Sequence, residues 1–160
     1  MPTKSIDTPL AEITLRRYEK PYNLSKRELV RKLCLSLGLL NPGDSRDVIV
    51  DILYVLLEAK KEQKKLSSEE IRDAVLEFRK QEKMDDNGTA ASNVRRQIRR
   101  LRTALIVEKL KNDYRITEFS NLGELFNEKT EKLMLPSIIA RLKEYLAAVD
   151  EVFKSKNDQH

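Results

Sequence analysis

The stretch that most constrains the fold lies between Val48 and Leu57, where apolar side chains occur on nearly every side of a predicted helix. This helix is predicted to begin near Ser45 and to end at about Lys61. Successive helical residues turn by about 100°, so its apolar positions cover most of the circumference: Val48, Ile49, Ile52, Leu53, Val55, Leu56 and Leu57. A helix that is apolar nearly all round has to be covered by other elements, so the sequence predicts a central core helix.

The composition favours a mainly helical chain around this core. The chain has 160 residues, 40% of them hydrophobic, which suits one domain or one domain with an appendage. It has only 4 glycines and 5 prolines and no tryptophan, too few turn-forming residues for an all-β fold. The longest apolar run, VIVDILYVLL, is interrupted by Asp51 and is too short to span a bilayer. No membrane association is therefore expected.

Two capping boxes predict where neighbouring helices begin. In a capping box, a serine side chain caps the first turn of a helix and a glutamate three residues later reaches back to the serine. Ser25 and Glu28 form one such pair, and the apolar helix that follows is predicted to end at Gly38. The sequence SSEE (67–70) forms another, before a helix predicted to end by Lys83.

The chain is predicted to have four parts. An arm occupies 1–23, and within it the segment 12–20 is predicted either to form a short strand or to lie along another subunit. A helix and turn follow at 24–44. The largest part, 45–128, ends in a β-hairpin over 105–117 and a short helix. Residues 129–160 form the last part, a long amphipathic helix with Pro136 at its entry and a frayed tail.

The predicted helix 90–104 is unusually basic. Five arginines lie between Arg95 and Arg102, and no acidic residue occurs from Thr89 to Val107. Helical spacing places an apolar stripe on one face, at Val94, Ile98, Leu101 and Leu105. A neighbouring face carries Asn93, Arg96, Gln97, Arg100 and Ala104, and a third carries Arg95, Arg99 and Arg102.

These residue types suit nucleic acid. Arginine binds guanine edges and phosphates, and asparagine or glutamine can pair with adenine in the major groove. The amino end of a helix adds free N–H groups for a phosphate. The net charge of +5 also favours anionic partners. The alternative is a solvated face, or one that pairs with acidic residues of another helix or subunit.

The order of elements over 45–126 resembles the winged helix-turn-helix superfamily. The resemblance is carried by NVRRQIRRLRTALIVEKLKNDYRITEFSNLGELF (93–126), in which an arginine helix runs directly into a strand, a short wing, a second strand and a helix with a glycine. It implies a mainly α fold with a small β-hairpin, flanked by N- and C-terminal helices. The domain 45–128 would then be the winged-helix domain.

The resemblance also implies roles for individual residues in binding double-stranded DNA. Base-edge or groove contacts fall on Asn93, Arg96, Gln97 and Arg100, and phosphate contacts on Arg95, Arg99 and Arg102. Thr89 or Ser92 would anchor a phosphate at the start of the helix. Lys109, Lys111 and Arg115 would touch the DNA from the wing, although hairpin solubility alone also accounts for such lysines.

The last helix carries a heptad pattern. Spacings of three and four residues connect Leu135, Ile138, Leu142, Tyr145, Val149 and Val152, as in a coiled-coil seam. Ile139, Leu146 and Phe153 form a second row. Homodimerisation through 135–153 is predicted, as in winged-helix regulators of the PadR-like and MarR-like type. The alternative is a single helix packed on its own domain.

The function favoured by the sequence is that of a dimeric DNA-binding protein, a transcriptional regulator in the cytoplasm at the nucleoid. A non-specific chromatin-type protein, or an interaction module for RNA or an acidic protein, fits the same features. An enzyme is not expected, because the chain lacks phosphate-binding glycine motifs and a nucleophile elbow. No cofactor or metal is expected either, since the only histidine is His160 and the only cysteine, Cys34, lies in an apolar helical run.

Overall fold

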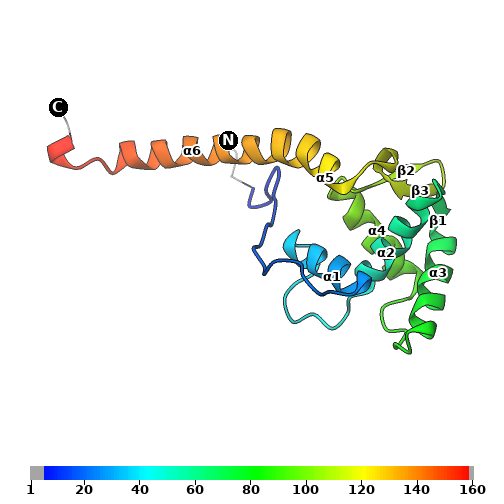
Figure 1. Ribbon diagram of the computed structural model, residues 1–160. Coiled ribbons are helices and arrows are strands. Elements are labelled where there is room, and N and C mark those ends of the chain that lie inside the picture. The colour runs from blue at the N-terminus through cyan, green and yellow to red at the C-terminus, as the bar shows by residue number, and fades with distance from the viewer. Residues whose placement is uncertain (1–5, 159–160) are drawn as a thin grey trace. The chain divides into compact units, whose positions relative to one another are not determined.

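The computed structural model describes residues 6–158 and divides the chain into two compact units (Figure 1). The main unit comprises residues 14–125. The terminal unit contains 6–13 and 126–158 among its described residues. The ends of the predicted arm and tail, 1–5 and 159–160 with His160, lie outside the described residues. The main unit includes both the predicted helix of 24–44 and almost all of the region 45–128.

The main unit is mainly helical with a small antiparallel sheet, as the composition predicted. Its helices are α1 (Lys26–Ser36), α2 (Val48–Lys61), α3 (Ser68–Gln81) and α4 (Ala91–Thr103), followed by a 3-10 turn (Thr117–Phe119) and the short helix α5 (Leu122–Leu125). Its strands are β1 (Leu66–Ser67), β2 (Val107–Leu110) and β3 (Asp113–Ile116), in the order β1-β3-β2.

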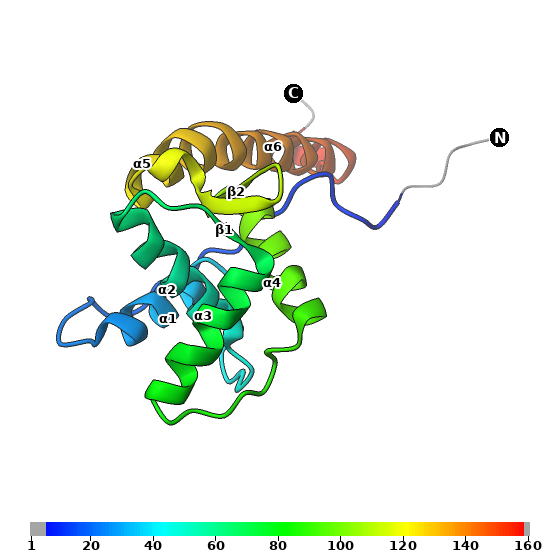
Figure 2. The ribbon, with the colours of Figure 1, turned by 90° about the vertical axis from the view of Figure 1, so that its right-hand side faces the viewer.

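Helix α2 is the centre of the core, which confirms the prediction from its apolar circumference. It lies among α1, α3 and α4 (Figure 2) and also contacts β3. Its fully buried side chains include Ile49, Val50, Asp51, Ile52, Leu53 and Leu56. Each buried aliphatic side chain contributes about 1.5–3 kcal/mol through removal of apolar surface from water, so α2 supplies a large share of the core's stability.

Both predicted capping boxes are present. The Ser25 Oγ accepts a hydrogen bond from the Glu28 N–H at 3.2 Å, and the Ser67 Oγ accepts one from the Glu70 N–H at 3.1 Å. The Glu70 carboxylate in turn accepts a bond from the Ser67 N–H, which lowers the pKa of that carboxyl. Helices α1 and α3 therefore begin at the predicted residues.

The sheet contains a third strand that the sequence analysis did not predict. The predicted hairpin is confirmed, with Val107 opposite Ile116 and Leu110 opposite Asp113. Strand β1, only two residues long, pairs with β3 through Leu66 opposite Tyr114. This pairing fastens the amino end of α3 to the hairpin, because β1 runs directly into the Ser67 cap.

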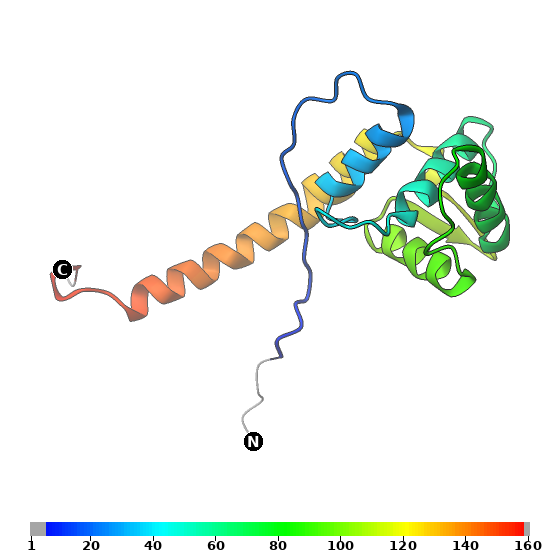
Figure 3. The ribbon, with the colours of Figure 1, turned by 90° about the horizontal axis from the view of Figure 1, so that it is seen from below.

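The prediction of a strand over 12–20 is wrong, since residues 14–24 follow an irregular extended path into α1 (Figure 3). Arg16 holds this segment on its own chain. Its N–H donates to the Ser36 carbonyl at 2.8 Å, and its guanidinium donates to the carbonyls of Leu35 and Leu40 at 2.8 and 3.0 Å. Carbonyls at the end of a helix lack intrahelical donors, so Arg16 satisfies the carboxyl end of α1.

Gly38 allows Thr14 and the segment after it to pack closely against the end of α1. Substituting Gly38 tests this packing. It has φ +72°, and an added Cβ would lie 2.5 Å from the Thr14 Cβ. Gly43 has a similar φ of +85° but open space around it. We expect Gly43→Ala to cost about 1–2 kcal/mol of unfolding free energy from the left-handed backbone. Gly38→Ala should cost about 1–3 kcal/mol more through overpacking, as measured by urea unfolding.

Thr14→Gly provides the control, because it removes the atoms that the new methyl group meets. Combined with Gly38→Ala, it should remove most of the difference from Gly43→Ala. Equal costs for the two glycine substitutions would show that the arm does not pack at Gly38 in solution.

The last helix begins earlier in the chain than the sequence analysis predicted. A separate helix was expected from Pro136, but the chain is already helical there. A π-helical stretch (Phe126–Met134) follows α5 and continues into α6 (Leu135–Val152). Proline has no N–H to donate, and Pro136 falls where π-type bonding gives way to α-type bonding, so the helix tolerates it. No helix in the described residues is long and apolar enough to cross a membrane.

Candidate nucleic-acid interface

Helix α4 packs through the predicted apolar stripe. Val94, Ile98 and Leu101 are buried in the core against α2 and α3. Leu105, the fourth predicted member, lies beyond the end of the helix at φ 66° and is half-buried. The inward face of α4 is therefore determined by three residues at helical spacing, and the rest of the helix is available to solvent.

The outward face of α4 is a surface of unpaired cations. Its five arginines are all exposed: Arg95, Arg96, Arg99, Arg100 and Arg102. Among the described residues none of them forms an ion pair, although ion pairs are frequent elsewhere in the main unit. We call these five residues the arginine face. In the described residues, the arginine face does not pair with acidic residues of another helix, which was one of the alternatives.

A ladder of hydrogen bonds orders the polar residues beside the arginine face. The Arg100 guanidinium donates to the Gln97 Oε1 at 2.9 Å, and the Gln97 amide donates to the Asn93 Oδ1 at 3.1 Å. The Asn93 amide donates to the Gly88 carbonyl at 2.7 Å. Asn93 thus fastens α4 to the connector before it, whereas Arg100 is held in position at the exposed end of the ladder.

The two residues predicted to anchor a phosphate at the start of α4 differ in exposure. Ser92 is exposed. Thr89 is buried, and its hydroxyl donates to the Asp86 carbonyl at 2.6 Å, while its own carbonyl accepts from the Arg72 guanidinium at 2.7 Å. The hydroxyl of Thr89 is therefore engaged in holding the connector, and this placement does not favour a phosphate contact by Thr89.

A shallow pocket lies between the amino ends of α3 and α4. Its lining residues are Ser68, Glu69, Arg72, Asp73, Ala91 and Arg95. The lining combines two carboxylates, Glu69 and Asp73, with two guanidinium groups, Arg72 and Arg95, so its charges offset one another. The arginine face therefore borders this pocket through Arg95.

The hairpin residues also divide into free and engaged cations. Lys109 and Lys111 are exposed, and Lys111 occupies the two-residue turn at φ 60°. Arg115 is half-buried, lies 3.4 Å from the Glu108 carboxylate and stacks at 4.8 Å over the Phe119 ring. Arg115 therefore contributes to the packing of the hairpin. Lys109, whose Nζ lies 5.8 Å from the centre of the Tyr114 ring, and Lys111 form no ion pair among the described residues.

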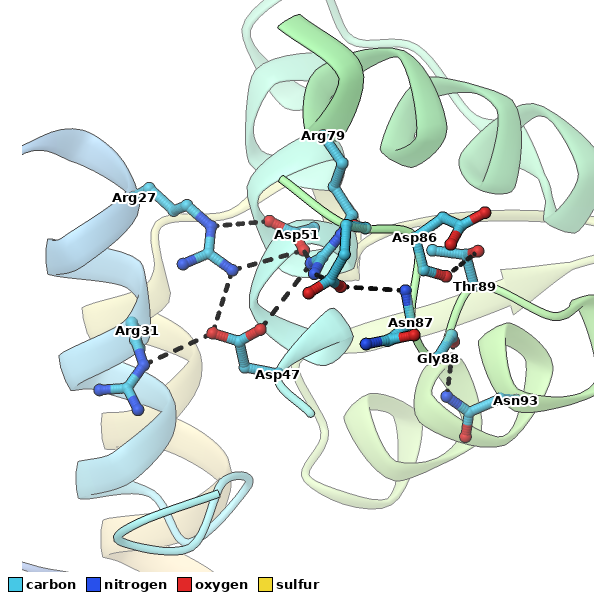
Figure 4. A network of polar contacts seen from close by, with 11 residues as sticks. Arg27, Arg31, Asp47, Asp51, Arg79, Asp86, Asn87, Gly88, Thr89 and Asn93 are labelled. Atoms are coloured by element: carbon cyan, nitrogen blue, oxygen red, sulfur yellow. Dashed lines mark hydrogen bonds and ion pairs between the residues drawn. The ribbon is translucent and has the colours of Figure 1, made fainter. Parts of the chain in front are cut away.

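A buried charge network supports the connector that leads into α4, and the sequence analysis missed it (Figure 4). Asp51 of α2 is fully buried and bonds two arginines, Arg27 of α1 at 2.8 Å and Arg79 of α3. Asp47 extends the network, lying 3.1 Å from Arg27 and 3.5 Å from Arg31. The available signal was Asp51 itself, a lone carboxylate within the most apolar segment.

The same network reaches the connector through Arg79. Its guanidinium, which is nearly buried, donates to the Asp85 carbonyl at 2.6 Å and lies 3.3 Å from the Asp85 carboxylate. That carboxylate accepts a bond from the Asn87 N–H at 3.0 Å. The segment 82–90 between α3 and α4 is therefore held by two arginines of α3, Arg72 and Arg79, and by the amide of Asn93 in α4.

Cys34 is shielded from solvent, and the acidic residues in the described part of the chain form no metal-binding cluster. Cys34 is fully buried, and burial raises the pKa of its thiol from 9.0 to about 12, so it stays protonated at neutral pH. No group of histidine, cysteine and carboxylate residues among those described is arranged to hold a metal ion.

The residues predicted for dimerisation lie along α6. None of the eighteen residues of this helix is buried. Leu135 and Ile138 are half-exposed, whereas the rest of the seam is between 53% and 77% exposed: Leu142, Tyr145, Val149 and Val152. Among the described residues of the terminal unit, no other segment covers this seam.

Comparison of the chain with protein-family models, with curated proteins and with solved structures returned no match.

Proposed function

We propose that this protein is a dimeric winged-helix DNA-binding protein that acts as a transcriptional regulator, with α4 as recognition helix and the β2–β3 hairpin as wing. The observation that carries the proposal is the arginine face, five exposed cations on one helix without an ion-pair partner among the described residues. Arginines at such density repel one another in a free helix, and phosphates of a duplex would neutralise them.

The order of elements supports the winged-helix part of the proposal. Helices α3 and α4 pack against each other and on α2, and α4 is followed directly by the hairpin. The connector 82–90 is longer than the three- or four-residue turn of a simple helix-turn-helix. The contacts of Arg79 and Asn93 to this connector offset its length, because they hold the start of α4 in one position.

Exposure refines the residues assigned to the DNA contact. Arg96 and Arg100, with Gln97 between them, are the base-edge candidates, and Arg95, Arg99 and Arg102 are the phosphate candidates. Ser92, Lys109 and Lys111 are exposed and remain candidates for backbone contacts. Asn93 is engaged with Gly88, so we assign it the role of orienting Gln97.

Binding to duplex DNA between about 50 and 200 mM salt tests the proposal. Log affinity should fall linearly with log salt, by about 0.9 for each phosphate neutralised. Arg96→Ala/Arg100→Ala should reduce that slope by roughly one to two and weaken binding at every salt concentration. Fluorescence anisotropy of a labelled duplex measures both quantities.

A charge-matched variant distinguishes direct DNA contacts by α4 from the effect of the protein's overall positive charge. Lys20→Ala/Lys80→Ala removes the same two charges from exposed positions outside α4 and the hairpin, and it should leave the slope nearly unchanged. Equal losses in both double variants, or no binding at 50 mM salt, would refute α4 as the DNA contact. Unrelated duplexes distinguish a sequence-reading regulator from a non-specific chromatin-type protein. An RNA hairpin and an acidic peptide in the same assay test the other partner classes.

A further inference from the structure

The apolar seam of α6 is symmetric about its own midpoint. In heptad terms Leu135, Leu142 and Val149 occupy one core position, and Ile138, Tyr145 and Val152 occupy the other. If a second α6 runs in the opposite direction, Leu135 meets Val152 of the second copy, and Ile138 meets its Val149. Leu142 then meets Tyr145 at the centre. All six seam residues are used in this alignment and none overhangs.

The charges of α6 favour the same direction. The first half of the helix carries two cations, Arg141 and Lys143, and no carboxylate. The second half carries three carboxylates, Glu144, Asp150 and Glu151, and no cation. Two parallel copies would gather both cationic halves at one end of the pair and both acidic halves at the other. Two antiparallel copies bring the cationic half of one helix to the same end as the acidic half of the other and also oppose the helix dipoles. Within each helix Arg141 also lies 3.0 Å from Glu144.

The second apolar row gives an independent argument. Ile139, Leu146 and Phe153 lie along one edge of the seam, and Arg141 lies along the other. In a parallel pair these two edges face each other, so Arg141 would lie against Leu146 of the second copy. In an antiparallel pair each edge meets the same edge of the other helix, so Ile139 lies near Leu146 of the second copy.

The exposed apolar surface is large enough for a stable pair. Seven apolar side chains of Ile139–Phe153 are 42–80% exposed: Ile139, Leu142, Tyr145, Leu146, Val149, Val152 and Phe153. Their combined exposed surface is of the same order as the roughly 800 Å² that one partner buries in a standard protein interface. Surface of this extent on one helix marks an interaction site.

We infer that α6 is the docking surface for a second copy of this chain, paired antiparallel in the register that sets Leu135 opposite Val152 of the second copy. The inference rests on the homodimer of the proposed function and defines its geometry. It does not depend on DNA, because every argument for it concerns α6 alone.

Disulfide trapping with the full chain tests direction and register together. Leu135→Cys and Val152→Cys are prepared as separate single variants, and each is oxidised alone and then after mixing. An α-helix rises 1.5 Å per residue, so equivalent positions at either end of an antiparallel pair are about 25 Å apart, too far for a disulfide. Intact mass spectrometry distinguishes the mixed dimer from dimers of one variant. Cys34 is buried, and the unmodified chain serves as the control for it.

The inference predicts that a covalent dimer forms only when the two variants are mixed, and that it contains one chain of each variant. Covalent dimers from each single variant alone would overturn it in favour of parallel helices. No covalent dimer under any condition, with a monomer mass by sedimentation at about 100 μM, would overturn it altogether. Trapping needs no DNA, so a trapped antiparallel dimer that fails to bind duplexes would leave this inference standing and refute the DNA proposal. A monomer that binds DNA would refute this inference and leave the proposed DNA binding standing.

Discussion

Replacing Asp51 by alanine is expected to lower the free energy of unfolding by about 3–5 kcal/mol, because it leaves a buried arginine without its partner. Asp51 is fully buried, and the Arg79 side chain that it binds is only 5% exposed. Arg79 would keep only the more peripheral carboxylates of Asp85 at 3.3 Å and Asp47 at 3.8 Å, and Arg27, which lies 2.8 Å from Asp51, would keep Asp47 at 3.1 Å. The fully buried carboxylate that offsets the lost hydration of Arg79 would then be missing.

Urea unfolding followed by circular dichroism measures this loss, and Glu58→Ala is the matched control. Glu58 lies on the same helix, and its carboxylate pairs with Lys26 and Lys61 at the surface, where its side chain is 42% exposed. Exposed ion pairs contribute about 0–1 kcal/mol, so Glu58→Ala should cost no more than that. Equal effects of the two substitutions would show that Asp51 and Arg79 are not paired in the folded protein.

A double substitution tests whether the cost arises from the unpaired charge. When both partners of a buried ion pair are replaced by apolar residues of similar volume, stability is often retained. Asp51→Leu/Arg79→Met should therefore be more stable than Asp51→Ala. It should still disturb the connector, because Arg79 also bonds the Asp85 carbonyl at 2.6 Å.

Replacing Leu101 by alanine is expected to cost about 2–5 kcal/mol, through the lost transfer energy and the cavity left between α4 and the core. Leu101 is fully buried and belongs to the same core cluster as Val94 and Ile98. Thermal or urea unfolding measures the effect. The folded fraction of the variant keeps the whole arginine face, so its DNA affinity per folded molecule should change little.

Substitution of the adjacent residue, Arg102, is expected to have the opposite effects on stability and on DNA binding. Arg102 is exposed on the other side of α4, and alanine is the best helix former. Arg102→Ala should therefore change the unfolding free energy by less than about 0.5 kcal/mol while weakening DNA binding. Comparable stability losses at 101 and 102 would mean that α4 packs through a different face from the one described.

Local sequence signals predicted most of the helices because those signals act within a few residues. The capping boxes at Ser25 and Ser67 placed the starts of α1 and α3, since a cap involves only four consecutive residues. The apolar periodicity of α2 and α4 placed their buried faces. The hairpin was predicted from two β-branched runs separated by a polar turn. Strand β1 could not be predicted, because two residues show no periodicity and its pairing with β3 joins distant segments.

The candidate site was predicted in part for the same reason. The outward position of the arginines follows from helical spacing alone. The contacts of Thr89, Asn93 and Arg115 do not follow from helical spacing, because they depend on the path of the chain around each residue. Their partners are the Asp86 carbonyl, the Gly88 carbonyl and the Glu108 carboxylate. A sequence pattern cannot distinguish a free cation from one paired across a hairpin.

The sequence by itself determined where the helices of the main unit begin, which faces of α2 and α4 are apolar, and that α4 carries five arginines without a local counter-charge. The tertiary structure alone decided that Asp51 binds Arg27 and Arg79, that the connector before α4 is held through Asp85, and that α6 keeps its seam exposed within its own unit. Caps and periodicities arise from neighbours along the chain, whereas charge pairing and burial depend on which distant segments the fold brings together. The search for partners of this protein therefore begins on α4 and α6, the two helices whose outer faces the described fold leaves without a partner.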